Sequence, residues 1–593
     1  MIGLGEALIL LIAFYFGLKL LFSTSISLAL ITVVVILVIL KINSWQYYWV
    51  NRNVPGPKGT FGLGNVSELM CGIFEADMKW KQLYGNTYGT INLGVPEYVT
   101  SNMDIVKAVY IKEFDNFVDR ESFLPFIVDD KKSILMNGML LKRGDDWRRI
   151  RGISSPAFTT GKMKLFTSLF NQSVQKTIEI LKLSEKEDKI VDVRQISEGL
   201  TMDSIFKAVF GVMTNVQENP NNEVLVKAKK FFELNIDLTF LMEIMFPNIS
   251  AYLRIKTGYH LTNNSEIQYF TNMLGKLYER RKKELETNVD LGKEPDFLTL
   301  LLKSIDEGDD TDKDDELMFH HASKQQKSKG LSKIEALGQC FLFLLAGYDT
   351  TASVLNFLLF LLAHHQDCQD KLREEMRDVI GDRDNKEIRY EDLSKLTYLD
   401  QCIKETMRLY PPGSRINRTC VKETEVNGIK FEKGVSVAVP IYHLHYDPDI
   451  FPQPETFNPD NFAPENKKQK ESFLGFGIGP RFCVGVRFAD ISIKVYIARL
   501  LAQFQFKTCE ESVSVPIEVT TKSVIRSVKT LFVKVENFGL IEPAATSELE
   551  ITPLTKSPKA GQIFKEYADD AGTVTGGFTA DIVAPARIVN VSM

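Results

Sequence analysis

The segment from Leu331 to His364 limits the possible folds of this chain more than any other. It is nearly uncharged and hydrophobic on all sides when wound as a helix, so it either crosses a membrane or runs through the centre of a large body. Asp349, Thr350 and Thr351 interrupt its middle. Polar groups in such a place are usually functional or carefully hydrogen-bonded. We therefore expect a buried central helix.

The amino terminus holds another long apolar run. Leu20 to Leu40 carries no charge, and about 20 apolar residues span a bilayer. We expect a transmembrane helix there, within an anchor at residues 1–45. Residues 7–18 add an apolar run that ends before Lys19, and the sequence leaves open whether it forms a second span, an interfacial helix or an extension of the first. No small-residue cleavage site follows, so a removed secretory signal is not expected.

Basic residues set the expected orientation of this anchor. Lys41, Arg52 and Lys58 follow the span, and positive charge stays on the cytoplasmic side, so the body should face the cytoplasm. Between them, residues 46–59 contain Val54-Pro-Gly-Pro-Lys-Gly59, where prolines fix φ and glycines permit sharp turns. We interpret this segment as a hinge between the membrane and the body.

The remaining chain is expected to form one large catalytic unit, residues 60–537. Hydrophobic residues make up 44% and charged residues 25% of the sequence, which is ordinary for a globular protein. The net charge of -5 gives no basic footprint for nucleic acid. Periodicity predicts a fold that is mainly α with small β-sheets. The expected elements are helices at Met163–Leu183 and Lys227–Phe246, a strand run at Thr90–Thr100 and a β-hairpin at Gly428–Val439.

Two segments outside this pattern are expected to lack a packed structure. Residues 306–330 are acidic and polar and are typical of a solvated surface loop. Residues 538–593 show no clear period and are interpreted as a poorly ordered tail.

The cysteines argue for one that acts alone. Seven are scattered at positions 71, 340, 368, 402, 420, 483 and 509, with no CxxC pair, which disfavours a disulfide framework or a structural zinc site. Cys483 differs from the others in standing in a glycine-punctuated loop, residues 473–489, that opens a helix running to about Phe504. Free backbone amides and the helix dipole favour a thiolate there. Neither GxGxxG nor GxxxxGK[ST] fits this loop, so it is not a phosphate cradle.

The loop carries a resemblance to a known family. Phe476-Gly-Ile-Gly-Pro-Arg-Phe-Cys-Val-Gly485 resembles the haem loop FxxGxRxCxG of the cytochrome P-450 superfamily of haem-thiolate monooxygenases. The resemblance covers about residues 50–536 with four further motifs in the family's order. It implies the cytochrome P-450 fold and haem b, with Cys483 as the axial ligand of the iron. The haem-contacting residues implied by this loop are Phe476, Gly477, Gly479, Arg481 and Gly485.

Two of the further motifs imply contacts with the haem and with oxygen. Trp147-Arg-Arg-Ile-Arg151 is similar to the family's WxxxR helix, in which Trp147 and Arg151 would hold the propionates. Ala346-Gly-Tyr-Asp-Thr-Thr351 resembles AGx[DE]T[TS]. It implies a groove for dioxygen at Ala346 and Gly347, with Asp349 and Thr350 as a proton relay. The alternative for Thr350 is that its hydroxyl only satisfies the carbonyl four residues earlier. Arg120 and Arg415 also sit where related enzymes place propionate-binding arginines.

The last two motifs imply a structural cradle. Glu405-Thr-Met-Arg408 resembles ExxR, which implies a buried ion pair. The family usually adds an arginine from a PERF-like segment, but here that segment places Asn461 at the arginine position. We expect the pair to be partly uncompensated and the cradle beneath the haem to be weaker. On this view, Asn461→Arg should raise haem retention on heating.

The resemblance is closest to the microsomal branch that contains the vertebrate drug- and steroid-oxidising family 3. It implies insertion of one atom of dioxygen into a lipophilic substrate (sterol, fatty acid or xenobiotic) at the endoplasmic reticulum membrane. The chain has no flavin or nicotinamide fingerprint, so electrons from NADPH should arrive through an NADPH-cytochrome reductase carrying FAD and FMN. Cytochrome b5 is a second candidate partner. Basic residues near the haem motifs could form the docking face; they are Lys142, Arg143, Arg148, Arg149, Arg481 and Arg487.

The substrate pocket is expected from segments that line it in similar enzymes. The candidates are Phe123, Leu124, Phe126, Phe343, Leu345 and Pro412. Two other functions stay open. One is a peroxide isomerase like thromboxane synthase, against which Asp349 and Thr350 argue. The other is a non-catalytic haem-binding sensor.

Overall fold

The computed structural model describes most of the chain outside several loops and the carboxyl-terminal segment. The described residues are 4–21, 24–120, 133–232, 246, 248–250, 252, 265–287, 296–305, 330–381, 383, 387–519 and 530–537. The predictions for residues 306–329, for the tail at 538–593 and for the pocket candidates Phe123, Leu124 and Phe126 therefore lie outside the described residues.

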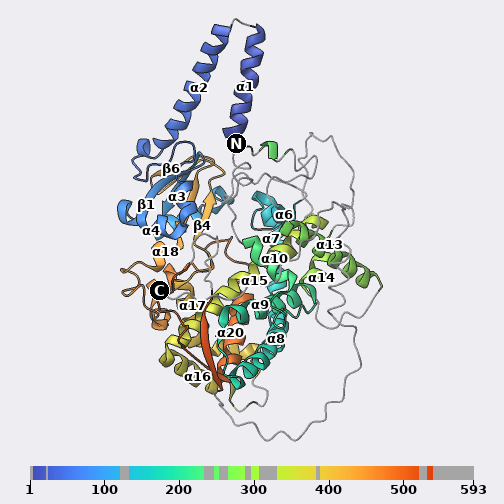
Figure 1. Cartoon of the computed structure of the whole chain (residues 1–593). Helices are drawn as coiled ribbons and strands as arrows, with labels where there is room; N and C mark the ends of the chain where they lie inside the picture. Colours follow the sequence, from blue (N-terminus) through green and yellow to red (C-terminus); the bar gives the residue numbers. More distant parts are fainter. Residues whose placement is uncertain are drawn as a thin grey trace, which may run out of the picture. The chain divides into compact units, whose positions relative to one another are not determined.

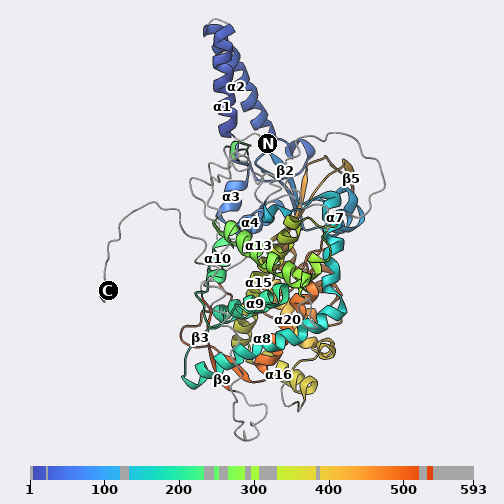
Figure 2. The ribbon, with the colours of Figure 1, turned by 90° about the vertical axis from the view of Figure 1, so that its right-hand side faces the viewer.

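Helices make up most of the described body, as predicted (Figures 1 and 2). The α-helices are α1 (Leu4–Leu21), α2 (Thr24–Gln46), α3 (Val66–Cys71), α4 (Ile73–Tyr84), α5 (Met103–Lys107), α6 (Ile134–Asn137), α7 (Gly144–Ser154), α8 (Thr160–Lys186), α9 (Val193–Phe210), α10 (Glu223–Phe232), α13 (Ser265–Glu286), α14 (Phe297–Leu302), α15 (Lys333–His364), α16 (Gln366–Ile380), α17 (Thr397–Leu409), α18 (Ile441–His445), α19 (Lys467–Ser472) and α20 (Val486–Leu501). Short turns of 3₁₀ or π helix lie at η1 (Val50–Arg52), η2 (Ala108–Lys112), η3 (Phe114–Asn116), η4 (Ser155–Phe158), η5 (Tyr390–Lys395) and η6 (Pro459–Phe462).

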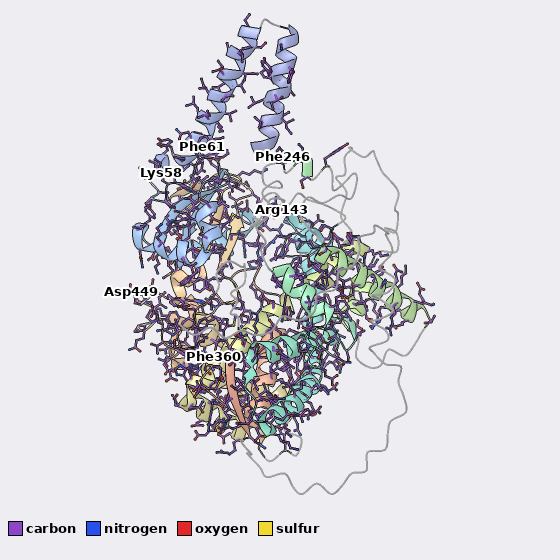
Figure 3. All side chains as sticks on the ribbon, viewed as in Figure 1. Lys58, Phe61, Arg143, Phe246, Phe360 and Asp449 are labelled. Carbon is purple, nitrogen blue, oxygen red and sulfur yellow. The ribbon has the colours of Figure 1, made fainter. Side chains whose placement is uncertain are left out.

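Helix α15 is the central helix that the sequence predicts. Its capping box starts it: the Ser332 side chain accepts from the backbone N–H of Glu335, and the Glu335 carboxylate accepts from the N–H of Ser332. The helix packs against α6, α9, α17 and α20, and Phe360 near its end is completely buried (Figure 3). Although α15 is long and apolar enough to cross a membrane, its surroundings make it the core helix of the body.

Three small sheets accompany the helices. The four-stranded sheet has the order β1 (Thr87–Asn92), β2 (Val95–Thr100), β7 (Ser436–Pro440), β4 (Arg415–Thr419), with only the β2–β7 pair parallel. A three-stranded antiparallel sheet joins β3 (Val191–Asp192), β9 (Phe532–Asn537) and β8 (Phe504–Lys507). The strand run expected at Thr90–Thr100 is thus two strands, β1 and β2, paired around a tight turn.

The hairpin predicted at Gly428–Val439 is wrong, because the strands and the turn that form the hairpin lie earlier in the chain. The observed hairpin pairs β5 (Thr424–Val426) with β6 (Ile429–Phe431). Its two-residue turn is Asn427-Gly428, and both residues have positive φ, 51° and 78°. Asn-Gly is the preferred sequence for a turn of this kind, because both residues tolerate the left-handed region. Strand β7 is not part of this hairpin and pairs instead within the four-stranded sheet.

Part of the segment interpreted as a hinge packs on the body. The Trp49 indole donates to the carbonyl of Thr90 at 2.8 Å, and the backbone N–H of Gly89 donates to the Pro55 carbonyl at 2.8 Å. A Cβ on Gly56 would lie 2.1 Å from the oxygen of Gly89. Residues 49–56 therefore pack directly on β1, where Gly56 permits the close approach; a hinge between the membrane and the body within residues 46–59 stays a prediction.

The expected apolar span also has different bounds. Leu20 and Leu21 end helix α1, and α2 begins at Thr24 and continues to Gln46. Residues 26–46 of α2 are long and apolar enough to cross a membrane.

Candidate haem-thiolate site

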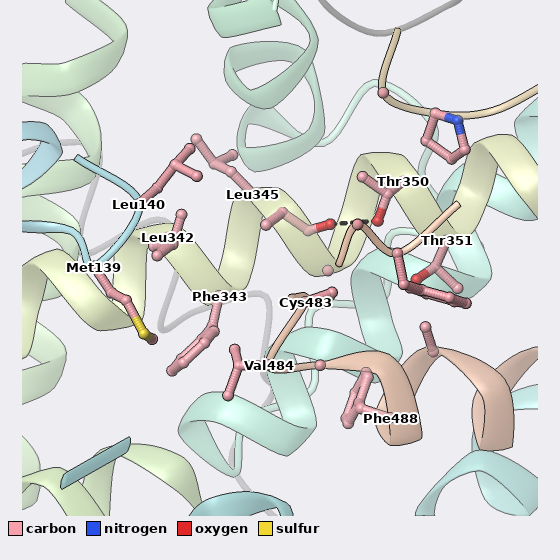
Figure 4. Close-up of a pocket in the computed structure, with 18 of the residues that line it drawn as sticks. Met139, Leu140, Leu342, Phe343, Leu345, Thr350, Thr351, Cys483, Val484 and Phe488 are labelled. Atoms are coloured by element: carbon pink, nitrogen blue, oxygen red, sulfur yellow. Dashed lines mark hydrogen bonds between the residues drawn. The ribbon is translucent and has the colours of Figure 1, made fainter. Parts of the chain in front are cut away.

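The loop before α20 presents Cys483 to a deep cavity. Gly477 and Gly479 both have φ of 75°, a region that favours glycine, and a Cβ on Gly479 would lie 1.9 Å from the Tyr110 carbonyl oxygen. The turn is closed by the N–H of Cys483, which donates to the Phe476 carbonyl at 3.0 Å. The Cys483 side chain lines the cavity beneath α15 (Figure 4).

Opposing influences act on the Cys483 thiol. Burial raises its pKa, whereas the backbone N–H of Gly485 and the guanidinium groups of Arg151 and Arg120 lower it. The hydrogen bond from the Gly485 N–H and the two guanidinium charges stabilise the thiolate. Burial by itself would favour the neutral thiol. A metal ion that binds such a thiol deprotonates it outright. The loop is therefore suited to hold a metal-bound thiolate.

Three arginines gather beside this loop: the half-buried Arg120 and the buried Arg418 and Arg481. Arg120 donates to the Arg481 carbonyl at 2.7 Å, and Arg481 donates to the Lys142 carbonyl at 2.7 Å and lies over the Trp147 ring at 4.3 Å. Burial together with the neighbouring arginines lowers the pKa of Arg481 to about 9, and burial with Arg120 lowers the pKa of Arg418 to about 9. Repulsion between buried like charges is unfavourable unless an anion joins them.

The cluster lacks enough anionic partners among the described residues. Among the described residues, Asp119 is the only carboxylate that forms an ion pair with the cluster, 3.9 Å from Arg481, and the Nε atoms of Arg418 and Arg481 are buried without a hydrogen-bond partner. A planar cofactor that carries two carboxylates satisfies this demand. The residues present therefore fit haem, which Cys483 would hold through its thiolate and the arginines through the propionates.

The sequence analysis placed Arg415 among the propionate-binding residues, and the structure corrects that assignment. It borders the cavity, but its guanidinium forms ion pairs with Asp77 and with Glu97, the latter at 2.9 Å. Arg418 is the residue that the sequence analysis missed. The two arginines are three residues apart on β4, so their side chains point to opposite faces of the strand. Strand alternation predicts that only one of the two arginines faces the haem, but it does not say which.

Helix α15 forms the opposite wall of the cavity through Ala346, Gly347, Thr350 and Thr351. The Thr350 hydroxyl donates to the Ala346 carbonyl at 2.6 Å, the dashed bond in Figure 4. The simple alternative for Thr350 is therefore present in the structure, and the same hydroxyl oxygen still borders the cavity as an acceptor. Gly347 also serves packing, because a Cβ there would lie 2.7 Å from the Ile205 methyl group of α9.

Asp349 does not line the cavity with Thr350. Burial, followed by the charge of the Glu198 carboxylate, raises the pKa of Asp349 to about 7, whereas the charge of Arg194 acts to lower it. Glu198 in turn pairs with Arg194 at 2.7 Å and with Lys229 of α10 at 2.6 Å. Asp349 therefore belongs to a group of charged residues around the buried Glu198 of α9, one residue from the cavity wall.

The ExxR pair forms the predicted cradle on α17. Glu405 and Arg408 are both completely buried, and Arg408 donates to both carboxylate oxygens. Asn461 donates to Glu405 Oε1 at 3.1 Å, as does the backbone N–H of Asn458 at 2.9 Å. The carboxylate is thus matched by one cation and two neutral donors. The prediction of a partly uncompensated pair is wrong, because the Asn461 amide reaches the carboxylate directly.

A buried histidine connects this cradle to the cysteine loop. Burial, followed by the charge of Arg408, lowers the pKa of His445 to about 3, so its ring is neutral. Nδ1 lies 3.2 Å from the Arg408 carbonyl, and Nε2 accepts from the N–H of Leu474 at 3.1 Å. With Nδ1 as the donor, the ring links α17 to the start of the cysteine loop. Sequence reasoning missed this role, since nothing in the local pattern distinguishes His445.

The cavity measures about 530 Å³ and is predominantly apolar. Besides the haem-site residues it is lined by Met139, Leu140, Phe231, Leu342, Leu345 and Phe476. Pro412 and Phe343, both predicted, also border it. Phe343 is only 9% exposed and packs edge-on against Phe158 and Phe297, and it points away from α15 on a different side from Leu345 (Figure 4). Phe343 therefore supports the cavity wall and offers little surface to a substrate.

A cysteine loop, an arginine cluster and an apolar cavity under one long helix together define a haem-thiolate protein. Comparison with known proteins agrees: the family "Cytochrome P450" matches residues 54–535. The chain therefore belongs to the cytochrome P450 family, whose members bind haem through a cysteine thiolate, and it is a haem monooxygenase. Its relatives include cytochrome P450 3A31 of Mesocricetus auratus, 31% identical over 488 residues, which are 82% of this chain and 91% of the relative. Cytochrome P450 3A16 of Mus musculus is 30% identical over 488 residues, with the same shares, and cytochrome P450 3A9 of Rattus norvegicus is 31% identical over 486 residues, 81% and 91%.

Proposed function

We propose that the protein is a membrane-bound monooxygenase that inserts one atom of dioxygen into a lipophilic substrate such as a sterol, fatty acid or xenobiotic. The observation that carries this proposal is the placing of Cys483 and Thr350 on opposite walls of one apolar cavity. Haem held by a thiolate supplies the chemistry: substrate, dioxygen, two electrons and two protons become hydroxylated product and water. Haem b is the form that Cys483, Trp147, Arg120, Arg151, Arg418 and Arg481 would hold without a covalent bond to its ring.

The chain's own residues would select the substrate by desolvation. The wall residues Leu140, Phe231, Leu342 and Leu345 offer no charged group, so a charged ligand would lose hydration without compensation. A neutral, hydrophobic molecule would gain from the same burial. The expected substrates are therefore uncharged over the part that enters the cavity.

Proton supply would fall to Thr350 and Asp349. The Thr350 oxygen can accept a proton from solvent or a neighbouring acid and pass its own toward the cavity, provided that it breaks its bond to the Ala346 carbonyl. Asp349 has a pKa of about 7, raised by burial and Glu198, which suits a group that gains and loses protons near neutral pH. Because Asp349 stands outside the cavity wall, it would act behind Thr350.

Electrons would arrive from NADPH through a flavoprotein reductase, with cytochrome b5 as a second donor. Of the six basic residues proposed as a docking face, Arg481 is buried and is removed from the set. Arg148 pairs with Asp115 and Asp145, and Lys142 and Arg149 pair with Glu335. Arg143 and Arg487 are exposed and have no carboxylate partner among the described residues. These two are the best candidates for contact with the acidic surface of a donor.

The carbon monoxide difference spectrum of the reduced holoprotein tests the central assignment. Thiolate ligation should shift the Soret band to the red in the wild type, and Cys483→His should abolish that shift while leaving some haem bound. An unshifted wild-type band would overturn the assignment. Turnover with reductase and NADPH then separates the monooxygenase from its rivals. A peroxide isomerase would turn over without reductase, and a haem sensor would oxidise no NADPH when a lipophilic ligand is added.

A further inference from the structure

Two apolar helices stand at the amino terminus where one span was expected. Helices α1 and α2 are separated only by residues 22 and 23, and they pack against each other, side by side in both Figure 1 and Figure 2. Two packed helices joined by so short a connection run antiparallel. The first residues of α1 therefore lie at the same end of the pair as the last residues of α2.

The exposure of the side chains supports this pairing. On α1 the partly covered described side chains are Leu11 and Tyr15, four residues apart. On the part of α2 before Lys41, Ser27 is buried and Ile31, Val34 and Val35 are partly covered. Both sets follow the three- and four-residue spacing of one helix face. Counting outward from residues 22 and 23 places Tyr15 level with Ile31, and Leu11 level with Val34 and Val35. The two covered stripes thus match in an antiparallel register.

Most other described side chains in residues 8–17 and 26–40 are apolar and exposed. The exposed large side chains are Leu8, Ile9, Leu10, Ile12, Phe14, Phe16, Ile26, Leu28, Leu30, Val33, Ile36, Leu37, Val38, Ile39 and Leu40. An apolar surface of this extent indicates an interaction with lipid or protein. The Thr32 hydroxyl donates to the Leu28 carbonyl at 2.9 Å, which satisfies it within the helix, as a hydrocarbon environment requires. Lipid is therefore the partner that this surface fits.

The lengths and the ends of the helices agree with two crossings. At about 1.5 Å per residue, the 18 residues of α1 and the 23 of α2 extend about 27 and 34 Å, close to the bilayer core of about 30 Å. Lys19 lies in the last turn of α1, from which its long side chain can reach the headgroups. Trp45 and Tyr48 lie at the other end of α2 and pack against the core of the body. Tyr48 also bonds Glu432 of the body.

We propose that α1 and α2 cross the bilayer as a helical hairpin whose outer surface contacts lipid chains, so that the amino terminus and the catalytic body lie on the same side. This topology does not depend on the haem chemistry. The carbon monoxide spectrum of the same preparation reports that chemistry separately, and it also verifies that each variant has folded.

Cross-linking tests the packing of the two helices in membranes. The pair Tyr15→Cys with Ile31→Cys should form a disulfide on mild oxidation. The matched control, Phe16→Cys with Ile31→Cys, should not, because Phe16 is 59% exposed. A protease site inserted between residues 22 and 23 makes the result visible, since the fragments stay joined only when bridged. No bridge in the first pair, or equal bridging in both pairs, would overturn the packing.

Glycan acceptor sites test the topology in microsomes. An acceptor sequence on a spacer between residues 22 and 23 should be glycosylated, whereas one at the amino terminus of the full chain should not. Deletion of residues 1–22 supplies the control, because a new amino-terminal acceptor before α2 should then become glycosylated. Glycosylation at the amino terminus of the full chain would show a single crossing. An unmodified acceptor between residues 22 and 23, with a modified deletion control, would show that α1 does not cross; either result overturns the hairpin.

Discussion

Arg408 donates to both oxygens of Glu405, from Nε at 2.8 Å and from Nη2 at 2.7 Å, and neither side chain is exposed to solvent. The same guanidinium donates to the carbonyls of His445, Pro454 and Thr456. One residue of α17 thus ties together the end of α18 and the segment at residues 454–456. A buried ion pair of this kind determines position more than it adds stability, since desolvation offsets much of the attraction.

Asn461 should contribute to this pair through its amide. Asn461→Ala removes one of the donors to a fully buried carboxylate, so we expect the free energy of unfolding to fall by about 1.5 to 3 kcal/mol. Asn461→Arg should not raise haem retention, because the carboxylate is already matched by Arg408 and a second cation would be partly buried. Loss of the Soret band during heating measures both variants. A higher midpoint for Asn461→Arg would restore the expectation from sequence.

Arg415 and Arg418 should have separable effects. Arg415→Gln leaves the buried carboxylates of Asp77 and Glu97 without their cation, and we expect a loss of about 3 to 5 kcal/mol in unfolding free energy. Arg418→Gln removes a charged donor from the arginine cluster without leaving a carboxylate unpaired. It should speed haem loss by about tenfold or more with a smaller change in unfolding. Transfer of haem to an acceptor protein and chemical denaturation measure the two quantities. Equal haem loss in both variants would contradict the assignment.

The glycines of the cysteine loop should differ in their tolerance of a methyl group. Gly479→Ala places a Cβ against the Tyr110 carbonyl at a positive φ, so we expect almost no haem-loaded protein. Gly485→Ala meets nothing closer than 4.0 Å and should load normally. The ratio of Soret to protein absorbance after purification compares them. Normal loading of Gly479→Ala would mean that the loop adopts another conformation.

Asp349 should make the coupling of oxygen consumption to product depend on pH. Its pKa of about 7, raised by burial and Glu198, means that it is protonated below neutral pH and ionised above. Product formed per NADPH should therefore fall by about tenfold between about pH 6 and pH 8, in proportion to the protonated fraction. Asp349→Asn should give a low and nearly constant ratio. Ionisation of this acid also destabilises the fold as pH rises through its folded pKa. The melting temperature of the wild type should therefore fall more over this pH range than that of Asp349→Asn.

Thr350 should matter for coupling rather than for folding. Thr350→Val removes the hydroxyl and should lower product per NADPH by about tenfold or more, with the electrons appearing as hydrogen peroxide. Thr350→Ser keeps the hydroxyl and should behave much like the wild type. If Thr350→Val keeps full coupling, the hydroxyl serves only the Ala346 carbonyl.

Local patterns in the sequence determined the parts of the site that lie along one element. The cysteine loop and the start of α20 follow from glycines within a few residues of Cys483. The central helix follows from an apolar run too long to be covered in any other way, and the Glu405–Arg408 pair follows from the resemblance to the ExxR motif, whose helical spacing permits the contact. Each depends on neighbours along the chain, which the sequence orders directly.

Tertiary structure decided which face of an element meets which partner. Strand alternation separated Arg415 from Arg418, but only the positions of Asp77 on α4 and Glu97 on β2 show which face Arg415 takes. The surroundings of Asp349 depend on α9, and the packing of residues 49–56 depends on β1. The phase of a helix or a strand is a rotation about its own axis. Contacts between distant segments settle that rotation, and no short stretch of sequence contains them.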